Sequence, residues 1–134
     1  MAGLVLKLGA REKLLINGAV VENGDRRSCI SVLTPNVKLL RLRDAIHPEE
    51  ASTPVRQTAY LAQLAITGDA EEEEVKPRIL KSIKQLETVF EDHDSREILT
   101  SAAEAAANGR FYSCLKRLKP LISREDRLLA TRRP

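Results

Sequence analysis

Six basic side chains in the first 43 residues have the types and spacing that best suit one chemical task, the binding of a polyanion. They are Lys7, Arg26, Arg27, Lys38, Arg41 and Arg43. Arg41 and Arg43 are two residues apart in a β-prone run, so a strand would point both toward one face, about 6.6 Å apart. Because a guanidinium presents its donors as a planar fork, such a pair could contact successive phosphates or a base edge. The alternative is that these cations pair with Glu22, Asp25 and Asp44 on the sheet surface.

The sequence contains no comparable arrangement for catalysis or metal binding. His47 and His93 have no second ligand at metal spacing, and there is no Gly-rich phosphate loop or nucleophile motif. Cys29 lies in a strand-like run and Cys114 on an apolar stripe, as buried thiols often do. The glutamates at residues 71–74 suit a solvated helix N-terminus better than a cation site, because neighbouring helical residues point in different directions. We therefore expect a protein that is not an enzyme and needs no cofactor.

The composition limits how an anionic partner could be recognised. The 134 residues carry a net charge of +3 and are 43% apolar. The charge divides into +4 over residues 1–47, −7 over residues 48–109 and +6 over residues 110–134. Basic ends of this kind can bind polyanions, attract the acidic middle, or form solvated helix faces. Aromatic residues make up 3% of the chain and none precedes Tyr60, so any nucleic acid would be held by Arg, Lys and backbone groups instead of stacked rings.

The sequence gives no sign of export or membrane insertion. No run approaches the roughly 18 uncharged apolar residues that a membrane span needs. The first four residues do not resemble the start of a secretory signal, and two distant cysteines suit a reducing compartment. We expect a cytoplasmic protein without a membrane partner.

Residues 1–47 are expected to form a β-rich region. Short β-prone runs cover residues 4–8, 13–16, 19–22, 28–33 and 37–43. Turn residues separate them, and Asn17-Gly18 is the dipeptide best suited to a two-residue hairpin turn. Five short antiparallel strands without a long connection predict a small meander or a partly open barrel.

Residues 48–134 are expected to be helical, ending in a basic tail. Apolar residues recur there at intervals of three and four. The predicted helices start at Pro54, at Asp94 and at Phe111, and in the remaining helix Pro77 either forms the start or causes a kink. Asp94 with Glu97 is the expected N-terminal cap of the third helix, Asn108-Gly109 predicts a helical hairpin, and the tail from Arg124 is expected to fray. The predicted fold class is α+β, a small β region followed by a bundle of three to four helices.

The run Leu14–Arg27 strongly resembles the FlbT family of alphaproteobacterial flagellin regulators. Its block INGAVVENGDRR combines two Asn-Gly turns, an aliphatic strand and an Arg pair, and the likeness continues through residues 39–44 and 108–112. The resemblance implies a post-transcriptional repressor that binds the 5′ leader of flagellin mRNA and limits its translation or stability. It also implies coupling to filament assembly, with flagellin and the activator FlaF as partners.

A weaker likeness concerns the N-terminal strands. Residues 4–6 and 12–16 are similar to the opening of CsrA-type translational repressors, although Leu8-Gly9 stands where that family has a basic pair. Those proteins bind RNA through the first and last strands of a strand-swapped dimer. The likeness implies that RNA faces Lys7, Arg41 and Arg43, that Arg26 and Arg27 contact phosphates, and that the chain is able to form a homodimer.

A flagellin-binding, chaperone-like protein is the alternative function. Ile79, Ile83, Leu86 and Phe90 form an aliphatic stripe that could accept an amphipathic helix. The default role of such a stripe is the internal core of a bundle. Capture of flagellin without leader RNA would favour this alternative.

Overall fold

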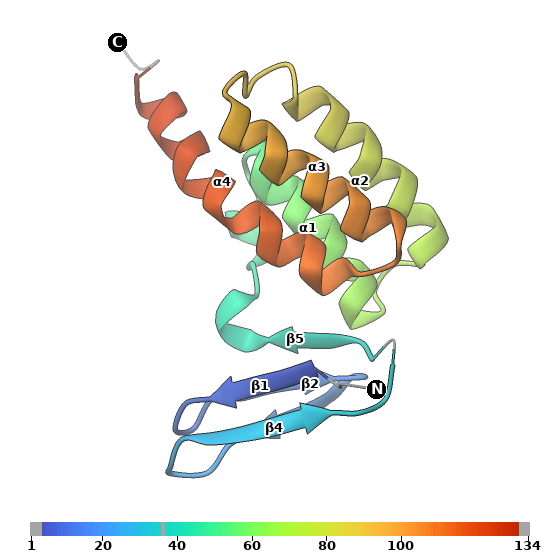
Figure 1. Cartoon of the computed structure of the whole chain (residues 1–134), viewed down its shortest axis with the longest axis vertical. Coiled ribbons are helices and arrows are strands. Elements are labelled where there is room, and N and C mark those ends of the chain that lie inside the picture. The colour runs from blue at the N-terminus through green and yellow to red at the C-terminus, as the bar shows by residue number, and fades with distance from the viewer. Residues whose placement is uncertain (1–3, 36, 132–134) are drawn as a thin grey trace. The chain divides into compact units, whose positions relative to one another are not determined.

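The computed structural model describes residues 4–35 and 37–131 and confirms the α+β class. Strands form the first part of the chain and helices the second (Figure 1). The chain divides into two compact units, Met1–Ala45 and Ile46–Pro134, referred to below as the N-terminal unit and the helical unit. None of the helices in the described residues has the length and apolar character that a membrane crossing requires.

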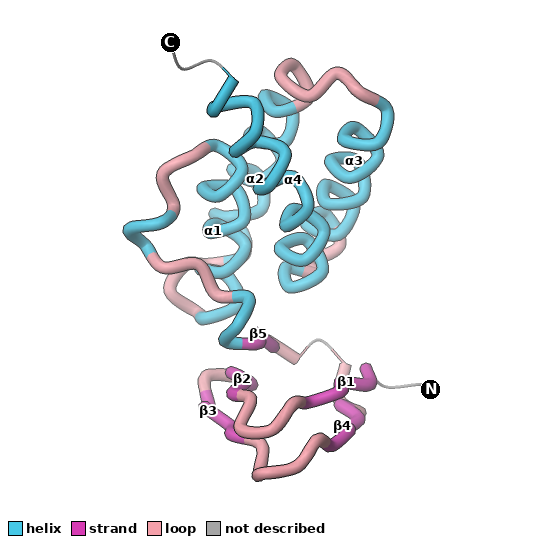
Figure 2. The backbone as a smooth tube through the Cα atoms, turned by 90° about the vertical axis from the view of Figure 1, so that its left-hand side faces the viewer, coloured by secondary structure: helices cyan, strands magenta, loops and turns pink. Residues whose placement is uncertain are grey.

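The strands of the N-terminal unit form two small antiparallel sheets. Within the described residues they are β1 (Leu4–Leu8), β2 (Lys13–Ile16), β3 (Ala19–Glu22), β4 (Ser28–Val32) and β5 (Leu39–Arg41). β1 pairs with β4, whereas β2 lies between β3 and β5. Figure 2 shows β1 beside β4 and β2 beside β3. This order differs from that of a meander, in which each strand pairs with the next.

Local sequence explains the first hairpin. Asn17 and Gly18 have φ angles of 48° and 86° and join β2 to β3, as expected for an Asn-Gly turn. The same turn is fastened to the start of β5, because the Asn17 N–H donates to the Lys38 carbonyl (2.8 Å) and Asn17 Oδ1 accepts from the Lys38 N–H (3.0 Å). In β1, Leu6 and Leu8 are buried while Val5 and Lys7 are exposed, which is the two-residue alternation of a half-buried strand.

The last strand is shorter than predicted. β5 ends at Arg41, and Leu42–Asp44 form a single 3-10 turn, η1. Arg43 therefore does not follow Arg41 along a strand, and the predicted strand spacing between the two was wrong, although both side chains reach Glu12 Oε2. The ladder between β2 and β5 stops at the pair Leu14 and Arg41, so the chain has no partner strand to keep it extended beyond that point.

The helical unit is a bundle of antiparallel neighbours. Its helices, within the described residues, are α1 (Pro54–Thr67), α2 (Glu72–Leu86), α3 (His93–Ala107) and α4 (Phe111–Thr131), preceded by the 3-10 turn η2 (Pro48–Glu50). α1 packs against α2 and α4, and α3 also packs against α2 and α4. The aliphatic stripe at residues 79–90 lies in this core, where Ile79, Ile83, Leu86 and Phe90 are buried.

Several predicted helix ends are confirmed. Thr53 caps α1 by accepting the Arg56 N–H on its Oγ1, and Gly68 ends the helix with a φ angle of 84°. The predicted helical hairpin joins α3 to α4 through Asn108 and Gly109. There the Arg110 N–H donates to the Ala105 carbonyl at 2.8 Å, the bond that closes a Schellman motif.

The cap of α3 and the state of the tail differ from the predictions. Asp92, not Asp94, caps α3, and its Oδ2 accepts the Ser95 N–H at 2.9 Å. Ser95 begins the buried face of α3, so the cap lies three residues before that face.

The predicted fraying from Arg124 was also wrong for the residues up to Thr131, which continue α4. Two acidic side chains hold this segment to the start of α1. Glu125 Oε2 accepts the Val55 N–H at 2.8 Å, and Asp126 Oδ1 lies 2.7 Å from the Arg56 Nη1. Contacts with residues 70 positions earlier in the chain therefore order the segment. The predicted tail beyond Thr131 lies outside the described residues.

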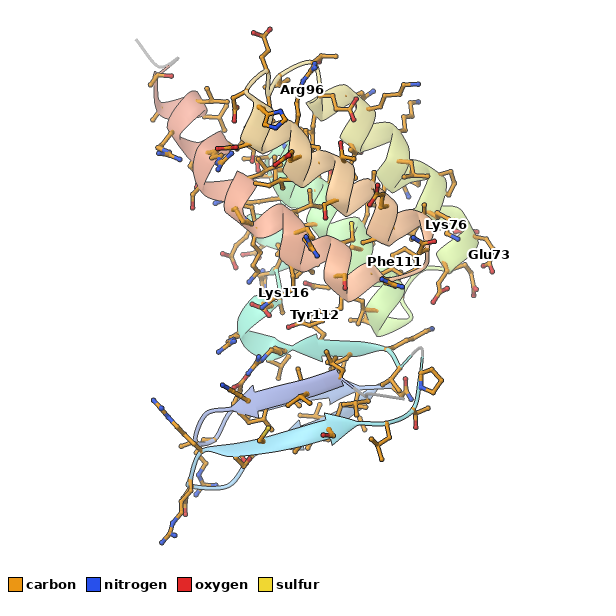
Figure 3. All side chains as sticks on the ribbon, viewed as in Figure 1. Glu73, Lys76, Arg96, Phe111, Tyr112 and Lys116 are labelled. Carbon is orange, nitrogen blue, oxygen red and sulfur yellow. The ribbon has the colours of Figure 1, made fainter. Side chains whose placement is uncertain are left out.

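The aromatic residues belong to the helical unit. Phe90 and Phe111 are buried, and Tyr60 and Tyr112 are partly exposed. The Lys116 Nζ lies 5.9 Å from the centre of the Tyr112 ring, one turn further along α4 (Figure 3). These positions fit the default role of core and hairpin contacts.

Candidate functional site

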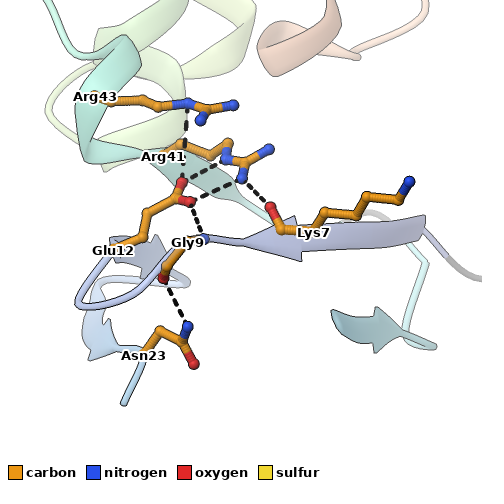
Figure 4. A network of polar contacts seen from close by, with 6 residues as sticks. All are labelled: Lys7, Gly9, Glu12, Asn23, Arg41 and Arg43. Atoms are coloured by element: carbon orange, nitrogen blue, oxygen red, sulfur yellow. Dashed lines mark hydrogen bonds and ion pairs between the residues drawn. The ribbon is translucent and has the colours of Figure 1, made fainter. Parts of the chain in front are cut away.

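A buried ion pair lies at one end of the N-terminal unit. The Arg41 Nε lies 2.7 Å from Glu12 Oε2 and its Nη2 lies 3.0 Å from Glu12 Oε1 (Figure 4). The two side chains are 10% and 11% exposed. Arg41 also donates to the carbonyl oxygen of Lys7. Arg41 therefore links β5 to β1 and to the turn that follows β1, and it pairs with Glu12, which is not among the acidic partners expected from the sequence.

Glu12 is held as a carboxylate by its neighbours. Hydrogen bonds from Arg41 and from the Gly9 N–H lower the pKa of Glu12 from its ordinary 4.5 to about 2. The Arg43 Nε lies 3.9 Å from Glu12 Oε2 and adds a favourable charge. The carboxylate thus stays charged at neutral pH and fixes the turn between β1 and β2.

Asn23 fastens the next loop to that turn. Its Nδ2 donates to the Gly9 carbonyl at 2.6 Å and to the Arg26 carbonyl at 2.9 Å. Its Oδ1 accepts from the Ser28 hydroxyl at 2.7 Å, and its N–H donates to the Glu12 carbonyl at 2.8 Å. The loop over residues 23–27 is therefore tied at both of its ends.

This loop presents the adjacent pair Arg26 and Arg27. Both are exposed, and neither makes an ion pair with any residue that the structure describes. They come directly before β4, whose first residue, Ser28, stands opposite Leu8 at the end of β1. Two cationic side chains on a fastened loop without carboxylate partners are suited to bind phosphate oxygens.

Further exposed cations lie on β1, in the turn after β1 and after β5. Lys7 is exposed on the face of β1 opposite the buried leucines, and the Arg43 side chain is 58% exposed. In Figure 4 the Lys7 side chain extends away from the ion pair. Arg11 is 65% exposed and lies 2.8 Å from Asp25 Oδ1 and 3.6 Å from Glu22 Oε1. We call this set the basic end: Lys7, Arg11, Arg26, Arg27 and Arg43.

The structure separates two predicted residues from this set. Lys38 lies next to the Asn17-Gly18 turn, at the opposite end of the sheet formed by β2, β3 and β5. Arg41 is buried in its pair with Glu12, so its guanidinium is not a surface group. Arg41 therefore has a structural role in the N-terminal unit, and the prediction that its side chain faces a ligand is corrected.

The sequence reading missed three residues of this region. Glu12 and Asn23 position the loop, and Arg11 adds a cation. Arg11 has a φ angle of 61° in the turn after β1, outside any strand pattern. Asn23 had been read only as a turn residue, although its amide is the type of side chain that bonds to nearby backbone.

Metal chemistry has no support in the part of the chain that the structure describes. Residues 4–35 and 37–131 contain no group of three or more His, Cys, Asp or Glu side chains that could hold an ion. Cys29 is exposed and Cys114 is buried, and burial raises the pKa of the Cys114 thiol to about 12. The basic end thus offers electrostatic binding as its chemistry.

Comparison with known proteins points to one family. The family model described as "Flagellar protein FlbT" matches residues 4–129. A protein of Brucella anthropi, named "Probable flagellum biosynthesis repressor protein FlbT", is 30% identical over 129 residues, which cover 96% of this chain and 84% of the relative. A protein of Allorhizobium ampelinum with the same name is 31% identical over 126 residues, covering 94% and 83%. No solved structure matches the chain significantly.

Proposed function

The chain belongs to the FlbT family, and we propose that it represses flagellar synthesis by binding the 5′ leader of flagellin mRNA. The names of the two relatives contain the words "flagellum biosynthesis repressor", which support the regulatory part of the proposal. The RNA-binding part is supported by the basic end. Bound protein would mask the leader from the ribosome or change the lifetime of the message, and neither effect needs a catalysed step.

The observation that carries the proposal is the Arg26-Arg27 loop, which the hydrogen bonds of Asn23 hold in place. Each arginine that meets a phosphate releases condensed counterions, and this release dominates the affinity for RNA. Because Asn23 already ties the loop to its surroundings, binding has little further backbone to order, and preorganisation of this kind increases affinity. The absence of ion-pair partners for the two guanidinium groups among the described residues means that binding breaks no ion pair there.

The proposed RNA contacts are Lys7, Arg11, Arg26, Arg27 and Arg43. Arg41 acts as a positioning residue, since it supports the turn through Glu12 and touches no ligand. Lys38 lies at the other end of the sheet formed by β2, β3 and β5. It would contact the RNA only if the bound segment extended beyond the basic end. No aromatic ring precedes Tyr60, so we expect recognition through the phosphate backbone with modest sequence preference.

Coupling to assembly requires a second ligand. Flagellin and FlaF are the partners that we propose, with the helical unit as the surface that binds them. The stripe at Ile79, Ile83, Leu86 and Phe90 is buried, so such a surface would be built from other residues. For the same reason the chaperone-like alternative has no specific structural observation in its favour.

A direct comparison of two RNAs tests the proposal. The purified protein is titrated, by fluorescence anisotropy, against the flagellin leader and against a segment of flagellin coding sequence of equal length. We expect tighter binding of the leader. Equal affinity for the two RNAs would contradict leader recognition, and binding of purified flagellin with no binding of either RNA would favour the chaperone-like alternative.

A further inference from the structure

β4 has an open edge. β1 is its hydrogen-bonded neighbour on one side, and no strand in the described residues pairs with it on the other (Figure 1). The sheet that it forms therefore has two strands. Such sheets are at best marginally stable alone, and stable sheets have three or more strands.

β4 is also distinguished by its lack of charge. Its sequence is Ser-Cys-Ile-Ser-Val, and of the five strands in the described residues it is the one without a charged side chain. Proteins commonly protect exposed strand edges with charged residues or proline. β3, which has two exposed valines, carries Glu22, which stands opposite Lys13 and lies near Arg11. β4 has no comparable protection.

Exposed apolar residues lie at the end of β4 and on its paired neighbour β1. Leu33, the residue after β4, is 77% exposed, and Leu4, opposite Val32 on β1, is 51% exposed. Val5, opposite Ser31, is 57% exposed. An open strand edge that ends in an exposed leucine is typical of a surface that pairs with another chain.

We propose that β4 pairs with β4 of a second copy of this chain, antiparallel and about a twofold axis. The product is a four-stranded sheet in the order β1, β4, β4, β1. A second copy fits because an uncharged strand meets no like-charge repulsion when it pairs with itself, whereas a foreign charged strand would gain no complementary charge. A twofold interface is also the commonest way in which identical chains associate.

The register that pairs all five residues places the axis at Ile30. Ile30 then faces Ile30 of the second copy, Cys29 faces Ser31, and Arg27 stands beside the exposed Leu33. The methylene groups of Arg27 can cover that leucine while the guanidinium stays in water. The two Arg27 residues lie at opposite ends of the paired strands, about 20 Å apart, so the basic ends do not repel each other strongly across the axis.

The test is the oligomeric state of the full chain in sedimentation equilibrium. We expect the wild type to approach twice the chain mass of 14.9 kDa as its concentration rises. Ser31→Lys places a lysine on each side of the axis, and we expect this variant to be a monomer. Its circular dichroism spectrum should match that of the wild type, which would show that it is folded. Ser113→Lys is the matched control, because Ser113 is an exposed serine on α4, and this variant should dimerise normally.

A second measurement needs no variant. Hydrogen exchange of the amides in residues 28–32 should slow as the concentration of the wild type increases, because pairing protects the edge of β4. A wild type that stays monomeric up to millimolar concentration would overturn the proposal. A folded Ser31→Lys variant that still forms a dimer would also overturn it. So would hydrogen exchange of the β4 amides at a rate that does not depend on protein concentration.

Discussion

The Arg41 guanidinium and the Glu12 carboxylate form a doubly hydrogen-bonded ion pair between residues 29 positions apart in the chain. The pair is almost fully buried, and the exposed Arg43 of the basic end lies 3.9 Å from its Glu12 Oε2. Glu12 also binds the Gly9 N–H, and Gly9 in turn accepts from Asn23. One continuous set of hydrogen bonds therefore runs from β5 through the first turn to the loop of Arg26 and Arg27.

Removal of the Arg41 side chain should destabilise the N-terminal unit. In Arg41→Ala the Glu12 carboxylate stays buried without its cation, which typically costs about 3 kcal/mol. Urea unfolding followed by hydrogen exchange in β1 and β5 measures the change. Arg27→Ala removes the same charge from an exposed side chain and should change stability by less than about 0.5 kcal/mol. Equal losses in the two variants would contradict a structural role for Arg41.

The stability of the N-terminal unit should depend on pH through Glu12. Its pKa is lowered from 4.5 to about 2 when folded, so the unfolded chain binds more protons between these values. The stability contributed by this group is complete above the unfolded pKa of 4.5 and is lost as the pH falls toward 2.

The variant Glu12→Gln cannot make this titration. It should be less stable than the wild type at neutral pH but should lose less stability between about pH 5 and about pH 3. Urea unfolding at several pH values measures both slopes, and Glu104→Gln, on the exposed face of α3, is the control. If Glu12→Gln and the wild type had parallel slopes, Glu12 would not be the group responsible.

Asn23→Ala should weaken RNA binding without removing a charge. The loss of its side-chain hydrogen bonds frees the Arg26-Arg27 loop and should reduce stability by about 1 kcal/mol. Affinity for the flagellin leader should fall several-fold, because the arginines must be ordered on binding. The dependence of affinity on salt should stay near that of the wild type, because the number of phosphate contacts is unchanged. A smaller salt dependence would show that the variant makes fewer phosphate contacts. It would contradict the expectation that Asn23 acts by ordering the loop.

Glu125 should contribute to the stability of the helical unit through the start of α1. Its side chain is buried and accepts the Val55 N–H, as an N-terminal cap would. Glu125→Ala should lower the free energy of unfolding by about 1 kcal/mol or more, whereas Glu125→Gln keeps an acceptor and should lose less. Thermal unfolding compares the two, and an equal loss would mean that packing, not the hydrogen bond, is what Glu125 provides.

The sequence predicted those features that depend on neighbouring residues. The Asn17-Gly18 turn, the alternation in β1 and the apolar faces of the helices follow from periods and turn chemistry within a few residues. The candidate cations Lys7, Arg26, Arg27 and Arg43 were found in the same way, since each is a basic residue in or beside a short β-prone run.

Long-range contacts account for what could not be predicted. The pairing of β1 with β4 and of Arg41 with Glu12 joins residues far apart in the sequence, which no local pattern encodes. Arg41 and Arg43 looked alike because their local contexts are alike, and the end of the β2 and β5 ladder separates them. Likewise, the segment after Arg124 was expected to fray because its contacts with Val55 and Arg56 lie 70 residues away.

The most direct test of the account is the salt dependence of RNA binding by the double variant Arg26→Ala/Arg27→Ala. Affinity for the flagellin leader is measured over a range of salt concentrations, with Lys81→Ala/Lys84→Ala as the control, because those exposed lysines on α2 carry the same charge. We predict that the arginine variant binds more weakly and that the slope of log K against log salt shrinks by about 1.4, which corresponds to two lost phosphate contacts. The lysine variant should match the wild type. An arginine variant with the affinity and slope of the wild type would contradict the proposal that this loop binds flagellin mRNA.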